Sequence, residues 1–230
     1  MADSQTIVQD PEAAHHLAHQ FADPEQQRET ATLGMWVFLA TEVLFFGALF
    51  CAYTIYRTNY AFAFDKASLK LDVVLGTINT AVLICSSFTM ALAVYSAGKG
   101  RNGAIIFFLI LTILLGLVFL GIKAYEYHSK FVEHLVPGAS FAFEGLEGAD
   151  LHHAEIYFSL YFAMTGLHAF HMIVGVGILA TLILMARRKR FSAGYNTPVE
   201  LSGLYWHFVD IIWIFLYPLL YLIGRHLKGG

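Results

Sequence analysis

The sequence predicts an all-α polytopic membrane protein, a bundle of five transmembrane helices. Hydrophobic residues make up 57% of the 230 residues and charged residues only 13%, whereas average soluble domains carry about 25% charged residues. Five stretches are long and apolar enough to cross a hydrocarbon core of about 30 Å. The alternating pattern of membrane β-strands is absent, and helices satisfy the backbone hydrogen bonds that lipid cannot.

The spans are predicted in order from the length of each apolar run. The first covers residues 33–56 and is apolar except for one carboxyl group, and the second, 73–95, is rich in small residues. The third covers 104–125, and the fourth, 156–186, is long enough to tilt or to extend beyond the bilayer. The fifth, 203–224, has aromatic residues near both ends, where they suit the membrane interface.

Polar segments flank the predicted membrane domain, which covers residues 32–226. Residues 1–31 are expected to form a polar, partly disordered tail, and residues 227–230 a short C-terminal tail. The first segment lacks the basic start and short apolar core of a cleavable signal peptide, so the first span is expected to stay in the mature protein. Its histidines are read either as a metal-binding cluster or, preferably, as part of a solvated tail: His15, His16 and His19.

Charge and cysteine content exclude several classes of protein. A net charge of −3 provides no basic surface for nucleic acid. The two cysteines, Cys51 and Cys85, lie inside apolar runs and form neither a disulfide framework nor a metal-binding pair. No nucleophile–base pair, phosphate loop or dinucleotide motif is visible. The sequence therefore predicts no nucleic-acid partner and no active site in this chain.

The basic residues predict a cytoplasmic N-terminus and an outside C-terminus. The 187–202 loop begins with four consecutive basic residues and shares its side with the N-terminus and the 96–103 loop. The opposite loop, 126–155, is acidic, with Lys130 as its only Lys or Arg. Short loops rich in Lys and Arg stay on the cytoplasmic side, so the dense basic run decides the orientation.

Glu42 is a carboxyl group placed inside the first span. A charge at mid-bilayer costs about 2.5–3.5 kcal/mol on insertion scales, so it requires a reason. Glu42 shares a helical face with leucine and phenylalanine residues. One interpretation is a group that exchanges protons, and the other is a protonated or hydrogen-bonded carboxyl that fixes helix packing. Because no proton path is apparent in the chain, the structural interpretation is favoured.

Histidines in the fourth and fifth spans allow two interpretations. His168 and His171 are three residues apart and share a face, as do His207 and Asp210 near the cytoplasmic start of the fifth span. Two helices that present imidazoles could hold a b-type haem by bis-His ligation. That requires facing pairs at matching depth, whereas His171 is placed near mid-span and His207 near one end. Hydrogen bonding between helices is therefore favoured.

Two further features concern packing and metal binding. Asn79 in the second span is expected to bond across helices, and small residues at spacing four in that span are predicted to form one packing stripe. His152 and His153, at a loop-to-helix junction, are read as metal ligands or, preferably, as exposed loop residues. The predicted stripe consists of Thr77, Ala81, Cys85, Thr89 and Ala93.

At these residues the chain resembles subunit III of the haem–copper terminal oxidases. The resemblance covers all five spans, about residues 31–226, and five strings in the right order make it specific. The strings are LGMWVFLATEVLFFGALFCAY, INTAVLICSS, LGLVFLGIKAYEYHSK, TGLHAFHMIVG and WHFVDIIWIFLYPLLYLIG. The matching residues are Glu42, Asn79, Thr80, Glu126, Tyr127, His168, His171, Trp206, His207, Asp210 and Trp213.

The resemblance implies a metal-free, non-catalytic accessory subunit of a cytochrome c oxidase, which couples aerobic respiration to proton translocation. Its implied partners are the catalytic subunit I, which holds haem and copper, subunit II, a small subunit IV and bound phospholipid. Its implied roles are stabilising subunit I and supporting proton uptake. Because this chain is similar to the five-span bacterial form, the expected location is the bacterial plasma (inner) membrane. The expected buried polar residues, structural or proton-linked, are Glu42, Asn79, Glu126, His168, His171, His207 and Asp210.

Other functions stay open on the sequence alone. The same five-span pattern fits subunit III of a quinol oxidase and the homologous accessory protein of nitric oxide reductase. A different class is a bis-His b-haem membrane anchor or a proton-linked transporter, because buried histidines and carboxyl groups serve both.

Overall fold

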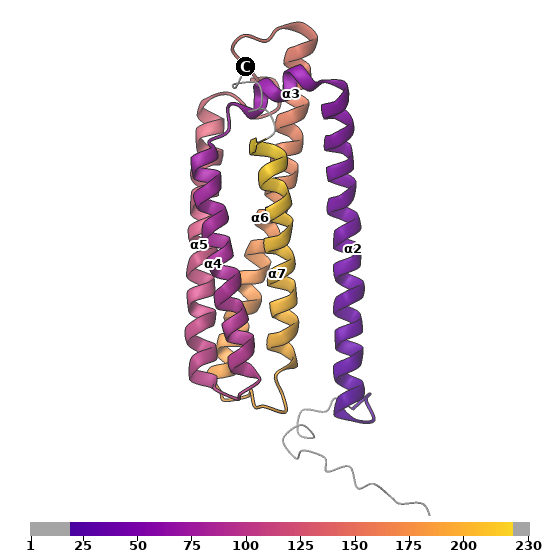
Figure 1. Cartoon of the computed structure of the whole chain (residues 1–230), viewed down its shortest axis with the longest axis vertical. Helices are drawn as coiled ribbons and strands as arrows, with labels where there is room; N and C mark the ends of the chain where they lie inside the picture. The colour runs from indigo at the N-terminus through magenta and orange to yellow at the C-terminus, as the bar shows by residue number, and fades with distance from the viewer. Residues whose placement is uncertain (1–18, 223–230) are drawn as a thin grey trace, which may run out of the picture.

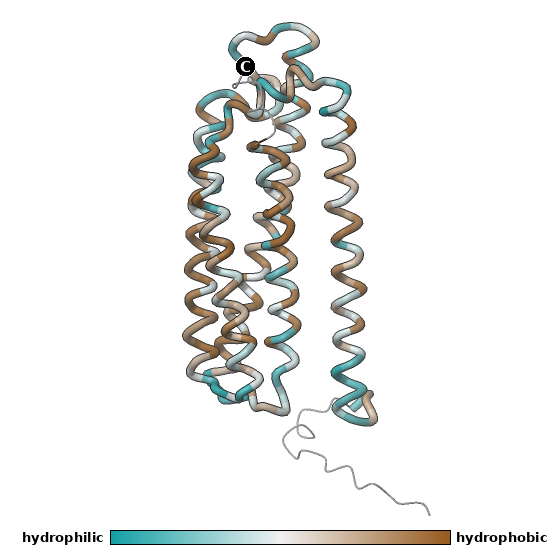
Figure 2. The backbone as a smooth tube through the Cα atoms, viewed as in Figure 1, coloured by the Kyte–Doolittle hydropathy of each residue, from teal (hydrophilic) through white to brown (hydrophobic). Residues whose placement is uncertain are grey.

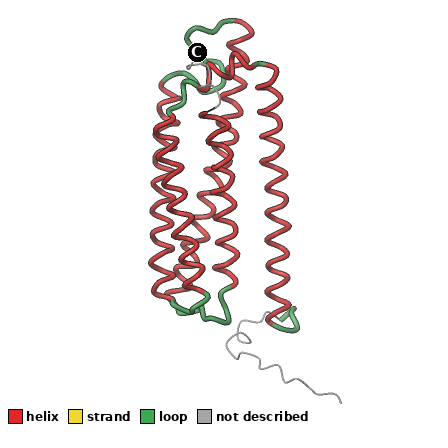
Figure 3. The backbone as a smooth tube through the Cα atoms, viewed as in Figure 1, coloured by secondary structure: helices red, strands yellow, loops and turns green. Residues whose placement is uncertain are grey.

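The computed structural model describes residues 19–222, which are mostly helical (Figures 1 and 3). Five of the helices are long and apolar enough to cross a membrane, which confirms the predicted fold class. Figure 2 shows mostly hydrophobic residues along their middle and hydrophilic residues toward their ends. The elements are α2 (Pro24–Asn59), α3 (Ala61–Ser68), α4 (Val73–Ala97), α5 (Asn102–Val132), α6 (Gly148–Arg187), α7 (Thr197–Tyr217) and the π-helical turn η1 (Pro218–Leu222).

Helix α2 begins at Pro24, ahead of the apolar run that predicted the first span. Asp23 caps its first turn by accepting a hydrogen bond of 2.7 Å from the Gln26 backbone N–H, and Pro24 suits the first helical position. Local capping therefore extends the helix into residues predicted as tail. Residues 1–18 and 223–230, including His15, His16 and the predicted 227–230 tail, lie outside the described residues.

The short helix α3 has no counterpart among the predicted elements. In Figure 1 it runs from the end of α2 over the end of the bundle, where it packs against α6 with Phe64 and Ala67 buried. Asp72 then starts α4 by accepting hydrogen bonds from the Val74 and Leu75 backbone N–H groups at 2.8 and 3.2 Å. The connection between the first two spans is thus a packed element.

Helices α4, α5, α6 and α7 form the bundle, and α7 packs against α4, α6 and α2. The bundle is tight around Trp206, whose indole is 1% exposed. A Cβ atom added to Gly175 would lie 2.9 Å from Trp206 Cζ3, and one added to Gly203 would lie 2.7 Å from Val94 Cγ2. Glycine at these two positions therefore lets the helices approach closely.

The observed helix ends correct two predicted positions. Helix α5 continues to Val132, so Glu126 lies inside a helix rather than in an acidic loop. Helix α7 begins at Thr197 rather than at 203, so His207 and Asp210 lie well inside the span rather than near its end. Polar residues in the first and last turns carry these helices beyond their apolar stretches.

The predicted stripe of small residues in the second span is wrong in part. Thr89 and Ala93 are buried, but Thr77, Ala81 and Cys85 are exposed. A spacing of four exceeds the helical repeat of 3.6 residues, so each step turns about 40° further around the helix. Over five residues the stripe leaves the packed face.

Candidate functional site

Polar groups inside the spans form three clusters. The Lys123 cluster joins α5, α6 and η1; the Glu42–His171 contact joins α2 and α6; and the α4–α7 contact includes His207 and Asp210. Ionisable residues inside the membrane have a high free-energy cost, and for that reason they are candidates for a functional role. The neighbours of each group therefore decide what it can do.

Lys123 lies at the centre of the first cluster and is 3% exposed. Its Nζ donates hydrogen bonds to Glu126 Oε2 at 2.9 Å, Tyr221 OH at 2.9 Å and Tyr161 OH at 3.1 Å. These use all three donors of the ammonium group. The Tyr221 hydroxyl in turn donates to Glu126 Oε1 at 2.6 Å. The buried ion pair is thus fully hydrogen-bonded and fixes three elements together.

Sequence reasoning missed Lys123 and placed Glu126 in a loop. The sequence did contain a signal for this ion pair, because Lys123 and Glu126 are three residues apart at the end of an apolar run. If the helix continues by one more turn, the two side chains become neighbours on its surface. The ring of Trp213 also lies 5.1 Å from Lys123 Nζ, within cation–π range. Aromatic rings and hydroxyl groups therefore replace the water that this charge would otherwise bind.

The π-helical turn η1 receives two further tyrosines. Tyr53 of α2 donates to the Leu219 carbonyl at 2.8 Å, and Tyr157 of α6 donates to the Leu220 carbonyl at 2.9 Å. Both tyrosine side chains are almost fully buried. The turn thereby connects α2 and α6 to the end of α7.

Glu42 faces His171 across the α2–α6 contact, with 3.2 Å between Glu42 Oε2 and His171 Nε2. This is an ion-pair distance, although Oε2 is not aligned for a hydrogen bond with any described residue. His171 Nδ1 lies 2.9 Å from the Leu167 carbonyl, which can only accept, so Nδ1 carries a proton. A carboxylate and an imidazole at this distance form an ion pair only when the imidazole carries both ring protons. The contact therefore joins α2 to α6 at this depth.

His168 does not follow the expectation of a hydrogen-bonded histidine. It is 1% exposed, and neither ring nitrogen has a hydrogen-bond partner among the described residues. Its ring packs against Phe119 and Trp213, with centroids 5.3 and 5.2 Å away. His168 and His171 thus contact different neighbours despite their shared face, because a spacing of three residues still separates two side chains by about 60° around the helix.

The α4–α7 contact contains several hydrogen bonds. His207 Nδ1 lies 2.7 Å from Ser87 Oγ, Trp206 Nε1 donates to Ser86 Oγ at 3.1 Å, and Trp213 Nε1 donates to Thr80 Oγ1 at 3.1 Å. The expected hydrogen-bonding role of His207 is therefore confirmed. On the neighbouring face of α4, the Asn79 amide donates to the Phe119 carbonyl of α5 at 3.4 Å, as expected of a residue that bonds across helices.

Asp210 is the exception in this cluster. It is 4% exposed, and neither carboxyl oxygen has a hydrogen-bond partner within the part of the chain that is described. Ser87 is close enough to interact with it, but outside hydrogen-bond geometry, and the Ser87 hydroxyl is engaged with His207. The hydrogen bond expected between this carboxyl group and another helix is therefore not formed within residues 19–222.

The histidines do not assemble into a metal site. His168, His171 and His207 contact separate neighbours, so no facing pair forms between α6 and α7. Within residues 19–222 there is no group of three or more His, Cys, Asp or Glu that could hold a metal ion. His152 and His153 lie in the first turns of α6, where His153 stacks on Tyr60 with centroids 3.7 Å apart.

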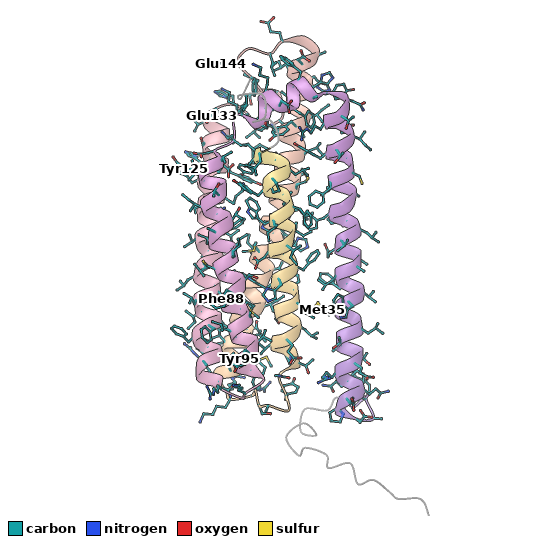
Figure 4. The ribbon with its side chains drawn as sticks, in the orientation of Figure 1. Met35, Phe88, Tyr95, Tyr125, Glu133 and Glu144 are labelled. Carbon is teal, nitrogen blue, oxygen red and sulfur yellow. The ribbon has the colours of Figure 1, made fainter. Side chains whose placement is uncertain are left out.

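A charged group lies outside the spans at the end of α5. Lys130 donates to Glu133 at 2.9 Å and to the Lys70 carbonyl at 2.8 Å, and Ser129 donates to Glu133 at 3.0 Å. Figure 4 labels Glu133 at this end of the bundle. Burial opposes ionisation of Glu133, but these hydrogen bonds and the charges of Lys130 and Lys70 outweigh it and lower its pKa.

Comparisons with known proteins place this arrangement among oxidase subunits. A family model described as cytochrome c oxidase subunit III matches residues 11–225. The chain is 30% identical over 198 residues to a protein named probable quinol oxidase subunit 3 from Staphylococcus haemolyticus (strain JCSC1435), covering 86% of this chain and 90% of that protein. It is 30% identical over 202 residues to the protein of the same name from Staphylococcus aureus (strain USA300), covering 87% and 92%.

Proposed function

Because this chain belongs to the cytochrome c oxidase subunit III family of haem–copper oxidases, we propose that it is an accessory subunit that packs on the catalytic subunit I and stabilises it. The family makes the chain part of a multi-subunit oxidase complex, and the five long helices make it a multi-pass membrane protein. The finer proposal concerns what this subunit does within that complex.

The observation that carries the proposal is that the buried polar groups of this chain connect its helices to one another. Lys123, Glu126 and His207 all make contacts that join one helix to another. Large apolar side chains meanwhile face outward at mid-span, such as Phe88 on α4 and Leu114 on α5, at 65% and 54% exposed. A rigid bundle with apolar outer faces suits a supporting subunit in the membrane.

We propose that this chain itself holds no haem or copper, and that these groups belong to its partner subunits. The separate packing of His168, His171 and His207 supports this, because bis-His ligation needs two imidazoles that face one another. Subunit II, a small subunit IV and phospholipid are the further proposed partners. Support of proton uptake is proposed for the subunit as a whole, and Glu42 is proposed as a packing residue whose contact with His171 joins α2 to α6.

The electron donor has two candidates. The description of the family model favours cytochrome c, which is the proposed donor of the complex, whereas the names of the two Staphylococcus relatives favour quinol. Oxidation of reduced cytochrome c and of a quinol by the purified complex, measured side by side, decides between them. The accessory role proposed for this chain is the same in both cases.

The proposed location is the bacterial plasma membrane, with the N-terminus cytoplasmic and the C-terminus outside. The basic run 187–190 lies at the same end of the molecule as the α4–α5 turn, which contains Lys99 and Arg101 (Figure 1). The 133–147 loop at the other end is acidic. Positive charge in short connections favours the cytoplasmic side.

Purification of the tagged chain from membranes in mild detergent tests the accessory role. We expect a haem–copper catalytic subunit to copurify in equal amount, with its haem absorption spectrum. An unrelated five-span protein with the same tag is the control. Recovery of the chain without any haem–copper subunit would overturn the proposal, and a stoichiometric bis-His Soret spectrum from the separated chain would overturn the metal-free assignment.

A further inference from the structure

The groove between α4 and α7 contains a polar group that the bundle leaves unused. The groove has a volume of about 390 Å³, and its walls are apolar apart from a few residues that include Ser87, His207 and Asp210. Ser87 Oγ and His207 Nδ1 are 2.7 Å apart and form a hydrogen bond with one another. The Asp210 carboxyl group lines the groove without a hydrogen-bond partner in residues 19–222. A hydrogen-bond donor other than residues 19–222 is therefore needed to complete it.

The depth of the groove limits what that can be. Asp210 lies halfway along the span Thr197–Leu222, about 20 Å from its start at 1.5 Å per residue. Ser87 is likewise near the middle of α4. Lipid headgroups lie at the membrane surfaces, and acyl chains at this depth offer no hydrogen-bond donor. A side chain of another transmembrane helix reaches this depth and can carry the hydrogen-bond donor that Asp210 lacks.

The rim of the groove also suits a neighbouring helix. Two large apolar side chains of α4 and two of α7 border the groove, and each is about half-exposed or more. Figure 4 labels one of them, Phe88 of α4. Such side chains pack against the apolar surface of another helix and exclude lipid from the polar centre. They are Ile84 at 57%, Phe88 at 65%, Ile211 at 49% and Ile214 at 49% exposed.

We propose that the α4–α7 groove is the docking site for a transmembrane helix of the catalytic subunit, which places a hydrogen-bond donor side chain against Asp210. A hydroxyl, amide or indole group satisfies the chemistry, because each can donate to a carboxyl oxygen. The inference rests on the proposed function, since it takes the haem–copper subunit as the partner. It adds the face of the chain that is used and the residue that the partner must satisfy.

Site-specific photocrosslinking in the intact complex tests the docking face. A photoreactive amino acid is placed at Phe88 or Ile214 on the groove rim and, as a matched control, at Leu117, which is 49% exposed on α5 and does not line the groove. We expect both groove positions to crosslink to the haem–copper subunit, at least tenfold more than the control position. Crosslinks from the groove to lipid alone, or to this chain alone, would overturn the inference.

Substitution of Asp210 tests the required donor. We expect Asp210→Leu to raise the dissociation constant for the haem–copper subunit about tenfold, which corresponds to about 1.4 kcal/mol. Asp210→Asn keeps a carbonyl acceptor and is expected to bind within about threefold of the wild-type chain. A structural role would have a different result, because Asp210→Leu would then lower the melting temperature of the separated full chain. We expect that temperature to stay equal or rise, since an unpartnered buried carboxyl is removed.

The two proposals fail in different ways. If the wild-type chain copurifies with no haem–copper subunit, the accessory function is wrong. If it copurifies but the groove positions do not crosslink, or Asp210→Leu binds as tightly as wild type, only the docking face is wrong.

Discussion

Helix α2 and the α4–α7 bundle are held in place in different ways. In the most apolar stretch of α2 only 11% of the residues are buried, against 56% in that of the span formed by α7 and η1. The buried residues of α2 are Leu39, Phe46 and Tyr53, spaced seven apart, so they form one narrow strip on the helix. The bundle instead combines close backbone approach at glycine with a fully bonded buried ion pair.

The difference shows two routes to helix association where lipid removes the hydrophobic driving force between helices. The bundle depends on polar groups that allow only one packing of the helices. The buried charge of Lys123, for example, is hydrogen-bonded only when α5, α6 and η1 pack as they do here. Helix α2 depends on one strip, one polar contact at Glu42 and one hydroxyl at Tyr53. Substitutions in the bundle should therefore cost more than comparable substitutions in α2.

The largest expected effect is in the bundle, at Lys123. We expect Lys123→Met to lower the free energy of unfolding by about 3–5 kcal/mol, because Glu126 is then a buried carboxylate without its cation. Thermal unfolding in detergent measures the loss. The double variant Lys123→Met with Glu126→Leu is the control and should be less destabilised than the single variant. Wild-type stability of Lys123→Met would show that the ion pair does not fix the bundle.

Substitution of one glycine in the bundle and one in α2 compares the packing of the two regions directly. We expect Gly175→Ala to cost about 1–3 kcal/mol, because its Cβ would lie 2.9 Å from the Trp206 ring. Gly47→Ala in α2 meets nothing within 4 Å and should be neutral or stabilising by up to about 1 kcal/mol. Melting temperatures of the two variants check the contrast. Equal losses at both positions would contradict the tighter packing of the bundle.

At the α2–α6 contact we expect a smaller effect. Glu42→Ala should lose about 1 kcal/mol of α2 association, since His171 Nε2 loses its partner, whereas Glu42→Gln should leave assembly largely intact. The yield of the haem–copper complex and the proton-pumping stoichiometry are measured together. If Glu42→Gln assembles normally but abolishes pumping, the carboxyl group is proton-linked rather than structural.

The smallest expected effect lies outside the membrane, at Glu133. Its pKa is lower in the folded than in the unfolded chain, so its stabilising contribution is present above about pH 4.3 and is lost as the pH falls through the folded value. For this half-exposed group the contribution is below about 1 kcal/mol. The melting temperatures of wild type and Glu133→Gln should therefore differ at pH 7 and converge at lower pH. A difference that grew on acidification would have the wrong sign.

The sequence allowed the five spans to be predicted because each apolar run is as long as the hydrocarbon core is thick. It did not determine where the helices end, because capping and polar first turns extend them, as Asp23 does for α2. The fold class follows from composition and length, whereas the helix ends follow from single side-chain contacts.

The sequence predicted several of the polar residues that lie inside the spans, but it did not predict which residues they contact. Glu42 and His207 were expected to meet polar groups, but the sequence does not show that these are His171 and Ser87. Lys123 was overlooked because a lysine near the end of an apolar run usually reaches the interface. Only the packing of α6 and η1 around it makes it a buried residue.

The two tyrosine contacts at η1 have a consequence for sequence divergence. Tyr53 and Tyr157 donate to backbone carbonyls of Leu219 and Leu220, which exist whatever side chains occupy those positions. The side chains of Leu219 and Leu220 can therefore vary without loss of either contact, whereas Tyr221 in the same turn cannot, because its hydroxyl bonds to Lys123 and Glu126. The attachment of α2 and α6 to the end of α7 thus depends on the two tyrosine donors and not on the side chains at positions 219 and 220.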